Sequence, residues 1–342
     1  HNVMVGYQSG EHADGATSPS VRNSYVGYQS GRYLDDGTNN VAIGYQSMYS
    51  NSAEGNNASD NVALGKDSLK LVTTGDSNIA VGAYALDAIT TSNHTIGIGV
   101  GALGGTASSL GSVVIGSSAG NNATFGNYNI IMGYTNGQGA LGTMNTFIGG
   151  VETGRVATSS YAIGIGAYAL QNTTAGGTVG IGHKALQSNT SGANNTAIGY
   201  QAMQEHVTGN NNTAIGYGAM NDSNGQAAEN NTFVGQGAGA GGYSGAAASN
   251  TSIGMASFGG GAKTAAAVGN TAVGRDSLYS VSSGASNTAV GYLAGNVIVT
   301  GLNNTIVGKG SNPSANNATN QNVFGFGTTG VSDNSVVLGN AV

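Results

Sequence analysis

One five-residue pattern recurs along the whole 342-residue chain: Asn, a β-branched residue, a small residue, an aliphatic residue and Gly. Clear copies are NVAIG (Asn40 to Gly44), NTAIG (Asn212 to Gly216) and NTAVG (Asn287 to Gly291). About twenty copies align, and their closing glycines are most often 17 residues apart. We take Gly327 as the nineteenth closing glycine, with Gly325 as the alternative. A repeat at a fixed period indicates one structural unit copied along the chain.

The length of the repeat limits the fold. A helix pair or a propeller blade needs roughly 34 or 40 residues, so 17 residues are too few for either. The repeat fits one coil of a β-solenoid, with two short strands joined by turns and each strand paired parallel to the next coil. No coil buries its apolar residues alone, so stacking makes the core continuous.

Within the pattern, the residue before the closing glycine is apolar in every aligned copy, and the residue two positions earlier is nearly always β-branched. Residues two apart in a strand share a face. We expect both columns to face inward and the small residue between them to face the other way. Glycine allows a sharp turn after the strand, where a Cβ would clash or φ is positive.

Composition excludes several classes of protein. Glycine contributes 61 residues, charged residues only 7%, and the formal net charge is −6. A globular domain usually carries about 25% charged residues, so a conventional enzyme is not expected. A nucleic-acid-binding protein needs a basic stripe, and none is present. No apolar run reaches the ~18 residues of a membrane span.

The pattern resembles the head repeats of trimeric autotransporter adhesins, which read roughly N-S-V-A-I-G-x-x-S. NNVAIGYQS (Asn39 to Ser47) and DNVALGKDS (Asp60 to Ser68) lie very near that form. NNTAIGYQAM (Asn194 to Met203) also looks like the repeat arrays of phage tail-fibre proteins. The resemblance covers essentially the whole chain. It implies a parallel β-roll with three chains side by side, the valine and isoleucine columns inside, and hence a homotrimer.

Asn occupies the first position of the pattern in most copies, which predicts a ladder of side-chain amides bonded from coil to coil. The alternative is that Asn is simply tolerated in a turn. Six residues represent the predicted structural ladder, three from the Asn column and three from the aliphatic column. They are Asn195, Asn212, Asn231, Ile198, Ile215 and Val234.

Tyr follows the closing glycine in seven copies. A row of rings on an outer face would bind glycans, because aromatic faces pack against sugar rings. The same rings would equally line an interface between chains, and the sequence leaves both interpretations open. The representative residues are Tyr45, Tyr200, Tyr217 and Tyr292.

Neither catalytic, cofactor-binding nor metal-ligating residues are predicted. The five His residues lack metal-site spacing, and His183, in the column after the glycine, is interpreted as a surface variant. A column of threonines invites an ice-binding interpretation, because a flat threonine array orders water. We set it aside on parity, because the threonines replace inward aliphatic residues. That column contains Thr196, Thr213, Thr232, Thr251, Thr271, Thr288 and Thr305.

The sequence thus predicts a single repetitive all-β segment over residues 1–342, with irregular longer coils at 7–26, 45–64 and 217–273. The expected function is a non-catalytic extracellular fibre or adhesin shaft of the phage tail-fibre type. A bacterial surface adhesin or filament subunit is the alternative, and an ice- or glycan-binding solenoid a remote one. The expected partners are further copies of the chain and a host cell-surface polysaccharide or protein, without nucleic acid or membrane insertion.

Overall fold

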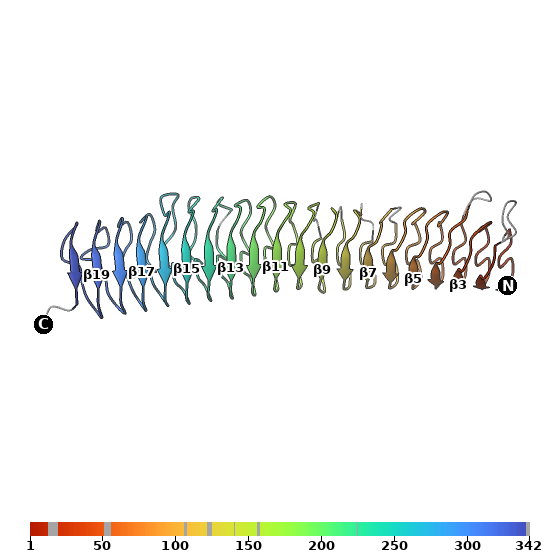
Figure 1. Ribbon diagram of the computed structural model, residues 1–342, viewed down its shortest axis with the longest axis horizontal. Helices are drawn as coiled ribbons and strands as arrows, with labels where there is room; N and C mark the ends of the chain where they lie inside the picture. The colour runs from red at the N-terminus through yellow and green to blue at the C-terminus, as the bar shows by residue number, and fades with distance from the viewer. Residues whose placement is uncertain are drawn as a thin grey trace. The chain divides into compact units, whose positions relative to one another are not determined.

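The computed structural model describes residues 1–12, 20–50, 56–105, 108–121, 125–139, 141–155, 158–223 and 225–339. Within these ranges the regular elements are all β-strands of three residues. The chain forms two compact units, residues 1–167 and 168–342. Each unit is a parallel β-solenoid (Figure 1), so the predicted all-β solenoid architecture of the chain is confirmed. Of the predicted irregular coils, residues 13–19, 51–55 and 224 lie outside the described ranges.

In the first unit each strand pairs parallel to the strand of the next coil. Its strands, over the ranges given above, are β1 (Val3–Val5), β2 (Ser24–Val26), β3 (Val41–Ile43), β4 (Val62–Leu64), β5 (Ile79–Val81), β6 (Ile96–Ile98), β7 (Val113–Ile115), β8 (Ile130–Met132), β9 (Thr146–Ile148) and β10 (Ile163–Ile165).

The second unit repeats this parallel pairing. Its strands in the described part of the chain are β11 (Val179–Ile181), β12 (Thr196–Ile198), β13 (Thr213–Ile215), β14 (Thr232–Val234), β15 (Thr251–Ile253), β16 (Thr271–Val273), β17 (Thr288–Val290), β18 (Thr305–Val307), β19 (Asn322–Phe324) and β20 (Val336–Leu338).

The register places equivalent residues of the repeat one above another. Between β12 and β13, for example, Ala197 pairs with Ala214 and Ile198 with Ile215. Each column of the sequence alignment is therefore a column of side chains in space.

The middle residue of each strand points into the coil, which corrects the inward orientation predicted for its two neighbours. Ala197 and Ala214 are fully buried, whereas Ile215 is 36% exposed. A leucine or methionine four residues after the closing glycine fills the coil from the other side. A Cβ built on Gly97, a middle residue, would lie 2.6 Å from Leu86 Cδ2. The alternation of side chains along a strand determines only which residues share a face, not which face points inward. The small residue points inward because a long side chain already occupies the interior of the narrow coil.

The prediction of two strands per coil is also wrong. Each coil contributes one strand, and beyond the strands the described residues form only isolated bridges, such as those of Leu302 with Ala285 and Thr319. Left-handed residues interrupt the chain after the glycine: φ is +55° at Gln201 and +49° at Met203. A strand requires φ near −120°, so these residues end it.

Apart from Gly149, the closing glycines adopt a conformation that L-residues rarely reach. At Gly199 φ is +140°, and a Cβ there would collide with the carbonyl oxygen of Gly216 in the next coil. This is the turn role predicted for these glycines. The structure also corrects the alignment: Gly325, with φ of +142°, closes β19, whereas Gly327 has φ of +60° and open space around it.

The residue before the buried Asn column is also left-handed. φ is +57° at Asn194 and +59° at Asn211. Asn tolerates this region better than most residues because its short polar side chain bonds locally. In each Asn-Asn pair the first Asn therefore makes the turn and the second enters the core.

Candidate functional site: the outward strand face and its flanking columns

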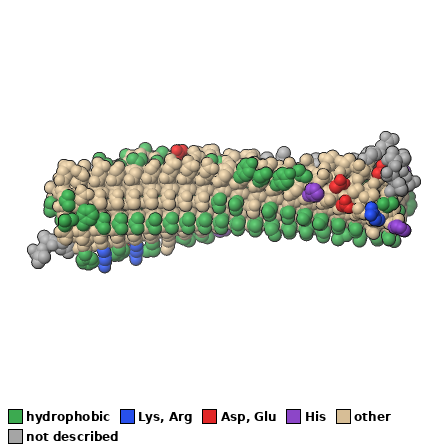
Figure 2. All heavy atoms as spheres, in the orientation of Figure 1, with side chains coloured by type: hydrophobic (Ala, Val, Ile, Leu, Met, Phe, Trp, Pro, Cys, Tyr) green, Lys and Arg blue, Asp and Glu red, His purple; other side chains and the backbone are tan. Residues whose placement is uncertain are grey.

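The first and third residues of every strand form what we call the outward strand face. Apolar and β-branched residues dominate it, and no Lys, Arg, Asp or Glu occupies either position in β1 to β20. Hydrophobic side chains form rows from coil to coil (Figure 2). Members at least about one third exposed include Ile43, Ile79, Ile98, Ile130, Ile148, Ile163, Ile215, Ile253 and Val290. An exposed apolar patch that is contiguous over many coils marks an interaction surface.

The aliphatic members of the predicted ladder lie on this face. Ile198 and Val234 are half-buried, and Ile215 is exposed. They stack in register with one another through β12, β13 and β14, but outside the chain's own core. The structure thus corrects their predicted place in the core and leaves them available to a partner.

The asparagine members are buried and bonded from coil to coil. Asn195 Oδ1 accepts hydrogen bonds from the backbone N of Asn212 at 2.9 Å and from its Nδ2 at 3.1 Å. Asn212 Oδ1 accepts the same pair from Asn231, at 3.1 and 3.0 Å. Each Nδ2 donates to a backbone carbonyl as well, as Asn212 does to Ala228 at 2.7 Å. Both groups of each buried amide are therefore satisfied.

Two of the predicted tyrosines stack face to face. The ring centroids of Tyr200 and Tyr217 lie 5.3 Å apart with planes 4° from parallel. His183 continues the stack, 5.2 Å from Tyr200. Because each ring covers its neighbour, the stack presents ring edges and hydroxyls rather than open faces. This arrangement favours ladder packing over sugar stacking within the run.

The other two predicted tyrosines lie against cations. Tyr45 has Lys66 Nζ 5.9 Å from its ring centroid. Lys66 also donates a hydrogen bond of 2.7 Å to the Tyr84 hydroxyl, and this bond raises the pKa of the Lys66 ammonium. Tyr292 has Arg275 Cζ at 5.7 Å and Lys309 Nζ at 5.8 Å from its ring centroid.

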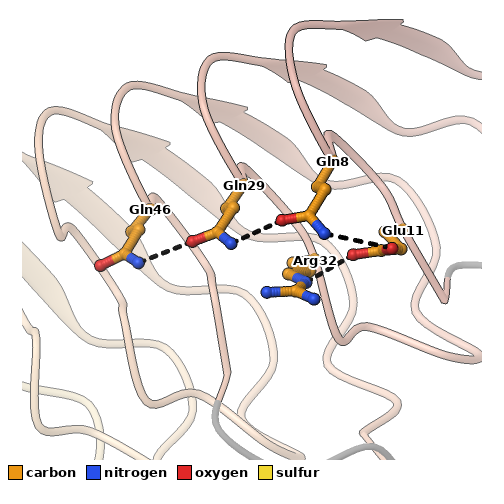
Figure 3. A network of polar contacts seen from close by, with 5 residues as sticks. All are labelled: Gln8, Glu11, Gln29, Arg32 and Gln46. Carbon is orange, nitrogen blue, oxygen red and sulfur yellow. Dashed lines mark hydrogen bonds and ion pairs between the residues drawn. The ribbon is translucent and has the colours of Figure 1, made fainter.

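A glutamine ladder in the first unit was missed by the sequence reasoning. Gln46 Nε2 donates to Gln29 Oε1 at 2.8 Å, and Gln29 Nε2 donates to Gln8 Oε1 at 2.7 Å (Figure 3). Gln8 then donates to Glu11, which is ion-paired with Arg32 at 2.6 Å. The recurring string GYQS, present in three consecutive copies, is the signal that predicts it.

Two buried titratable residues lie in the second unit. His206 contacts Ser223 Oγ through Nδ1 at 3.1 Å and the Gly209 carbonyl through Nε2 at 2.8 Å, and burial lowers its pKa. Lys263 is fully buried, with Nζ 5.1 Å from the Phe258 ring centroid and bonded to no acceptor among the described residues. Burial lowers the pKa of Lys263 to about 7. Both are enclosed in the coils and face no open surface.

Metal-ligand clusters and membrane-spanning helices are both absent from the described ranges. These residues contain no group of three or more His, Cys, Asp or Glu arranged to hold a metal ion. Nor do they contain a helix with the length and hydropathy of a membrane span. No protein-family model matches the chain, and no curated protein matches it.

Proposed function

We propose that the chain is a non-catalytic structural segment of an extracellular fibre, of the kind found in virion tail fibres. In this proposal three copies associate side by side through the outward strand face. The observation that carries the proposal is that face itself: two uncharged, largely apolar columns that run from coil to coil and that no element of the described residues covers.

The energetics support association. Fully burying a Val or Ile side chain contributes about 1.5–3 kcal/mol, and each coil offers one or two half-exposed residues of this kind. The face is also held by backbone pairing in every coil, so little conformational entropy is lost on binding. The number of copies is taken from the resemblance to adhesin head repeats.

The architecture suits a spacer. Each coil contacts its neighbours alone, so a unit lengthens by about 4.7–4.9 Å per added coil without a new core. Buried amide ladders and stacked tyrosines, rather than surface ion pairs, are the main side-chain contacts between successive coils. A fibre segment needs this regularity, and it needs no reactive group.

Immunogold electron microscopy tests the location. Antibodies raised against the purified chain are applied to virus particles and to cells from the source culture. Gold on virion fibres is the expected result. Gold confined to bacterial surface filaments favours the alternative, a cell-surface adhesin or filament subunit, and gold inside cells contradicts both.

A second candidate function rests on the threonine column, which the structure places outward rather than inward. Thr196, Thr213 and Thr232 pair in register on the outward strand face of β12 to β14, which removes the parity argument against ice binding. A flat array of hydroxyl and methyl groups orders water. Thermal hysteresis of the purified chain, abolished by Thr213→Lys, would support this candidate; its absence excludes it.

A further inference from the structure

We propose that four residues of the second unit form a binding site for an acidic polysaccharide, one that carries a carboxylate on alternate sugar rings. The residues are Arg275, Tyr292, Lys309 and Phe326, here called the cation–aromatic column. The proposal goes beyond the structural role, because it assigns a ligand class to a surface outside the outward strand face.

The four side chains occupy equivalent places in successive coils. Each follows a closing glycine: Gly274, Gly291, Gly308 and Gly325. The strands before these glycines, β16 to β19, pair parallel and in register. The four side chains therefore form one row. All are exposed, with Tyr292 at 40% and Phe326 at 68%.

Cations and rings alternate along the row. Arg275 Cζ lies 5.7 Å from the Tyr292 ring centroid. Lys309 Nζ lies between two rings, 5.8 Å from the centroid of Tyr292 and 5.5 Å from that of Phe326. These distances are within the ~6 Å range of cation–π attraction. The rings thus hold two otherwise flexible cationic side chains in place before any ligand arrives.

The charge of the row remains available to a ligand. Lys309 forms no ion pair with a described residue, and the pair of Arg275 with Asp276 engages Nε at 3.0 Å. No acidic residue follows any closing glycine in the described coils. With Asp276 counted against Arg275 and Lys309, the row still carries a local charge of +1, on a chain whose formal net charge is −6.

The spacing fits a charged sugar chain. Arg275 and Lys309 are two coils apart, which parallel pairing sets at about 9–10 Å. One ring of an extended polysaccharide is of similar length to one coil, so a carboxylate on alternate rings meets both cations. The rings of Tyr292 and Phe326 are exposed, and because the cations lie over their faces, it is their edges that offer apolar surface to the sugar C–H groups.

A polyphosphate chain fits less well. Nucleic acid is bound by neutralising many closely spaced phosphates, and this row supplies two cations over four coils. We therefore argue for the polysaccharide and make nucleic acid an outcome of the test.

The test measures binding of a hyaluronan hexasaccharide, in which every second sugar carries a carboxylate, by isothermal titration calorimetry. Chitohexaose serves as the neutral probe and a short oligothymidylate as the phosphate probe. We expect hyaluronan to bind, affinity to fall with added salt, and Lys309→Gln to weaken binding at least tenfold. The matched control is Lys184→Gln, which removes one cation elsewhere in the unit and leaves the affinity unchanged.

Three results of the binding measurements would overturn the proposal. They are absence of hyaluronan binding, equal affinity of the wild-type chain and Lys309→Gln, and tighter binding of oligothymidylate than of hyaluronan. Molar mass is measured on the same samples, so loss of binding with assembly intact separates this site from the fibre proposal. If Tyr292→Ser abolishes assembly as well as binding, the column is an interface between copies and the ligand assignment fails.

Discussion

At the scale of single residues, coil stacking depends most directly on the closing glycines. At Gly199 two independent constraints coincide: a φ of +140° and the carbonyl oxygen of Gly216 in the path of any Cβ. At Gly218 φ is +59°, and nothing lies within 4 Å of the added Cβ. A comparison of substitutions at these two glycines therefore separates the cost of conformational strain from the cost of a backbone collision.

We expect Gly199→Ala to destabilise the second unit by roughly 3 kcal/mol or more, because strain of about 1–3 kcal/mol adds to a backbone collision. Gly218→Ala should cost only about 1–2 kcal/mol, the strain of a left-handed alanine. Thermal or denaturant unfolding of both variants measures the difference. Equal losses would show that the close approach of neighbouring coils does not restrict this position.

Lys263 makes stability depend on pH. Its ammonium has a pKa of about 7 when folded and 10.5 when exposed, and Asp222 partly opposes this lowering. Between these values the unfolded chain holds a proton that the folded chain lacks, so the free energy of unfolding rises with pH. Buried Tyr243 has a raised pKa and acts oppositely, but only above its ordinary value of 10.0.

We therefore expect the melting temperature of the second unit to increase from pH 7 to pH 10. Lys263→Met should flatten that increase and stabilise the unit at pH 7, since no charge is then buried. Lys184→Met, at a partly exposed site, serves as the control and should keep the wild-type slope. Calorimetric scans across the interval measure all three chains, and an unchanged slope in Lys263→Met would refute this role for the amine.

At the scale of elements, the Asn ladder connects each strand to the next through side chains as well as backbone. Asn212 both accepts from Asn231 and donates to Asn195 and Ala228. Asn211, the preceding residue, is exposed and donates one bond of 3.3 Å to Asn230. The two residues are the same amino acid in very different surroundings.

We expect Asn212→Asp to destabilise the second unit by about 2 kcal/mol or more, because it removes two buried donations and places a carboxylate against two acceptors. Asn211→Asp adds the same charge at an exposed left-handed position that Asp tolerates, so its effect should stay within about 0.5 kcal/mol. Unfolding by denaturant compares them. A similar effect in both variants would contradict the ladder.

Much of the arrangement of strands and turns was predictable from the sequence. The period of the pattern fixed the parallel strands, and the glycine column fixed the turns. Which face of the strand points into the coil was not predictable, because alternation determines only which residues share a face. Gly325 and Gly327 flank the single residue Phe326, so the pattern does not distinguish them, whereas their φ angles and surroundings do. The position of the two cations beside Tyr292 could be assigned only once the structure showed that residues 17 apart lie side by side.

At the scale of the whole molecule, the outward strand face is the apolar surface that the described part of the chain leaves uncovered. Monomeric soluble proteins rarely expose large contiguous apolar patches. Here the first and third strand positions carry no charged residue in β1 to β20. This choice of residues supports the proposed association of copies through that face.

Introducing charged residues into the outward strand face gives the variant that tests association most sharply. Ile198, Ile215 and Ile253 lie on the outward strand face, and replacing all three by Lys should prevent association while the buried alanine column holds the coil. The matched control introduces three lysines at exposed turn positions, Ser191, Ala227 and Ala265. Circular dichroism verifies that both variants remain folded.

The molar mass in solution, measured by light scattering after size-exclusion chromatography, tests the central claim most directly. The wild-type chain and the turn variant should each have about three times the 33.5 kDa of one chain, and the face variant the mass of a single chain. A wild-type mass of 33.5 kDa at every protein concentration would contradict association through the outward strand face.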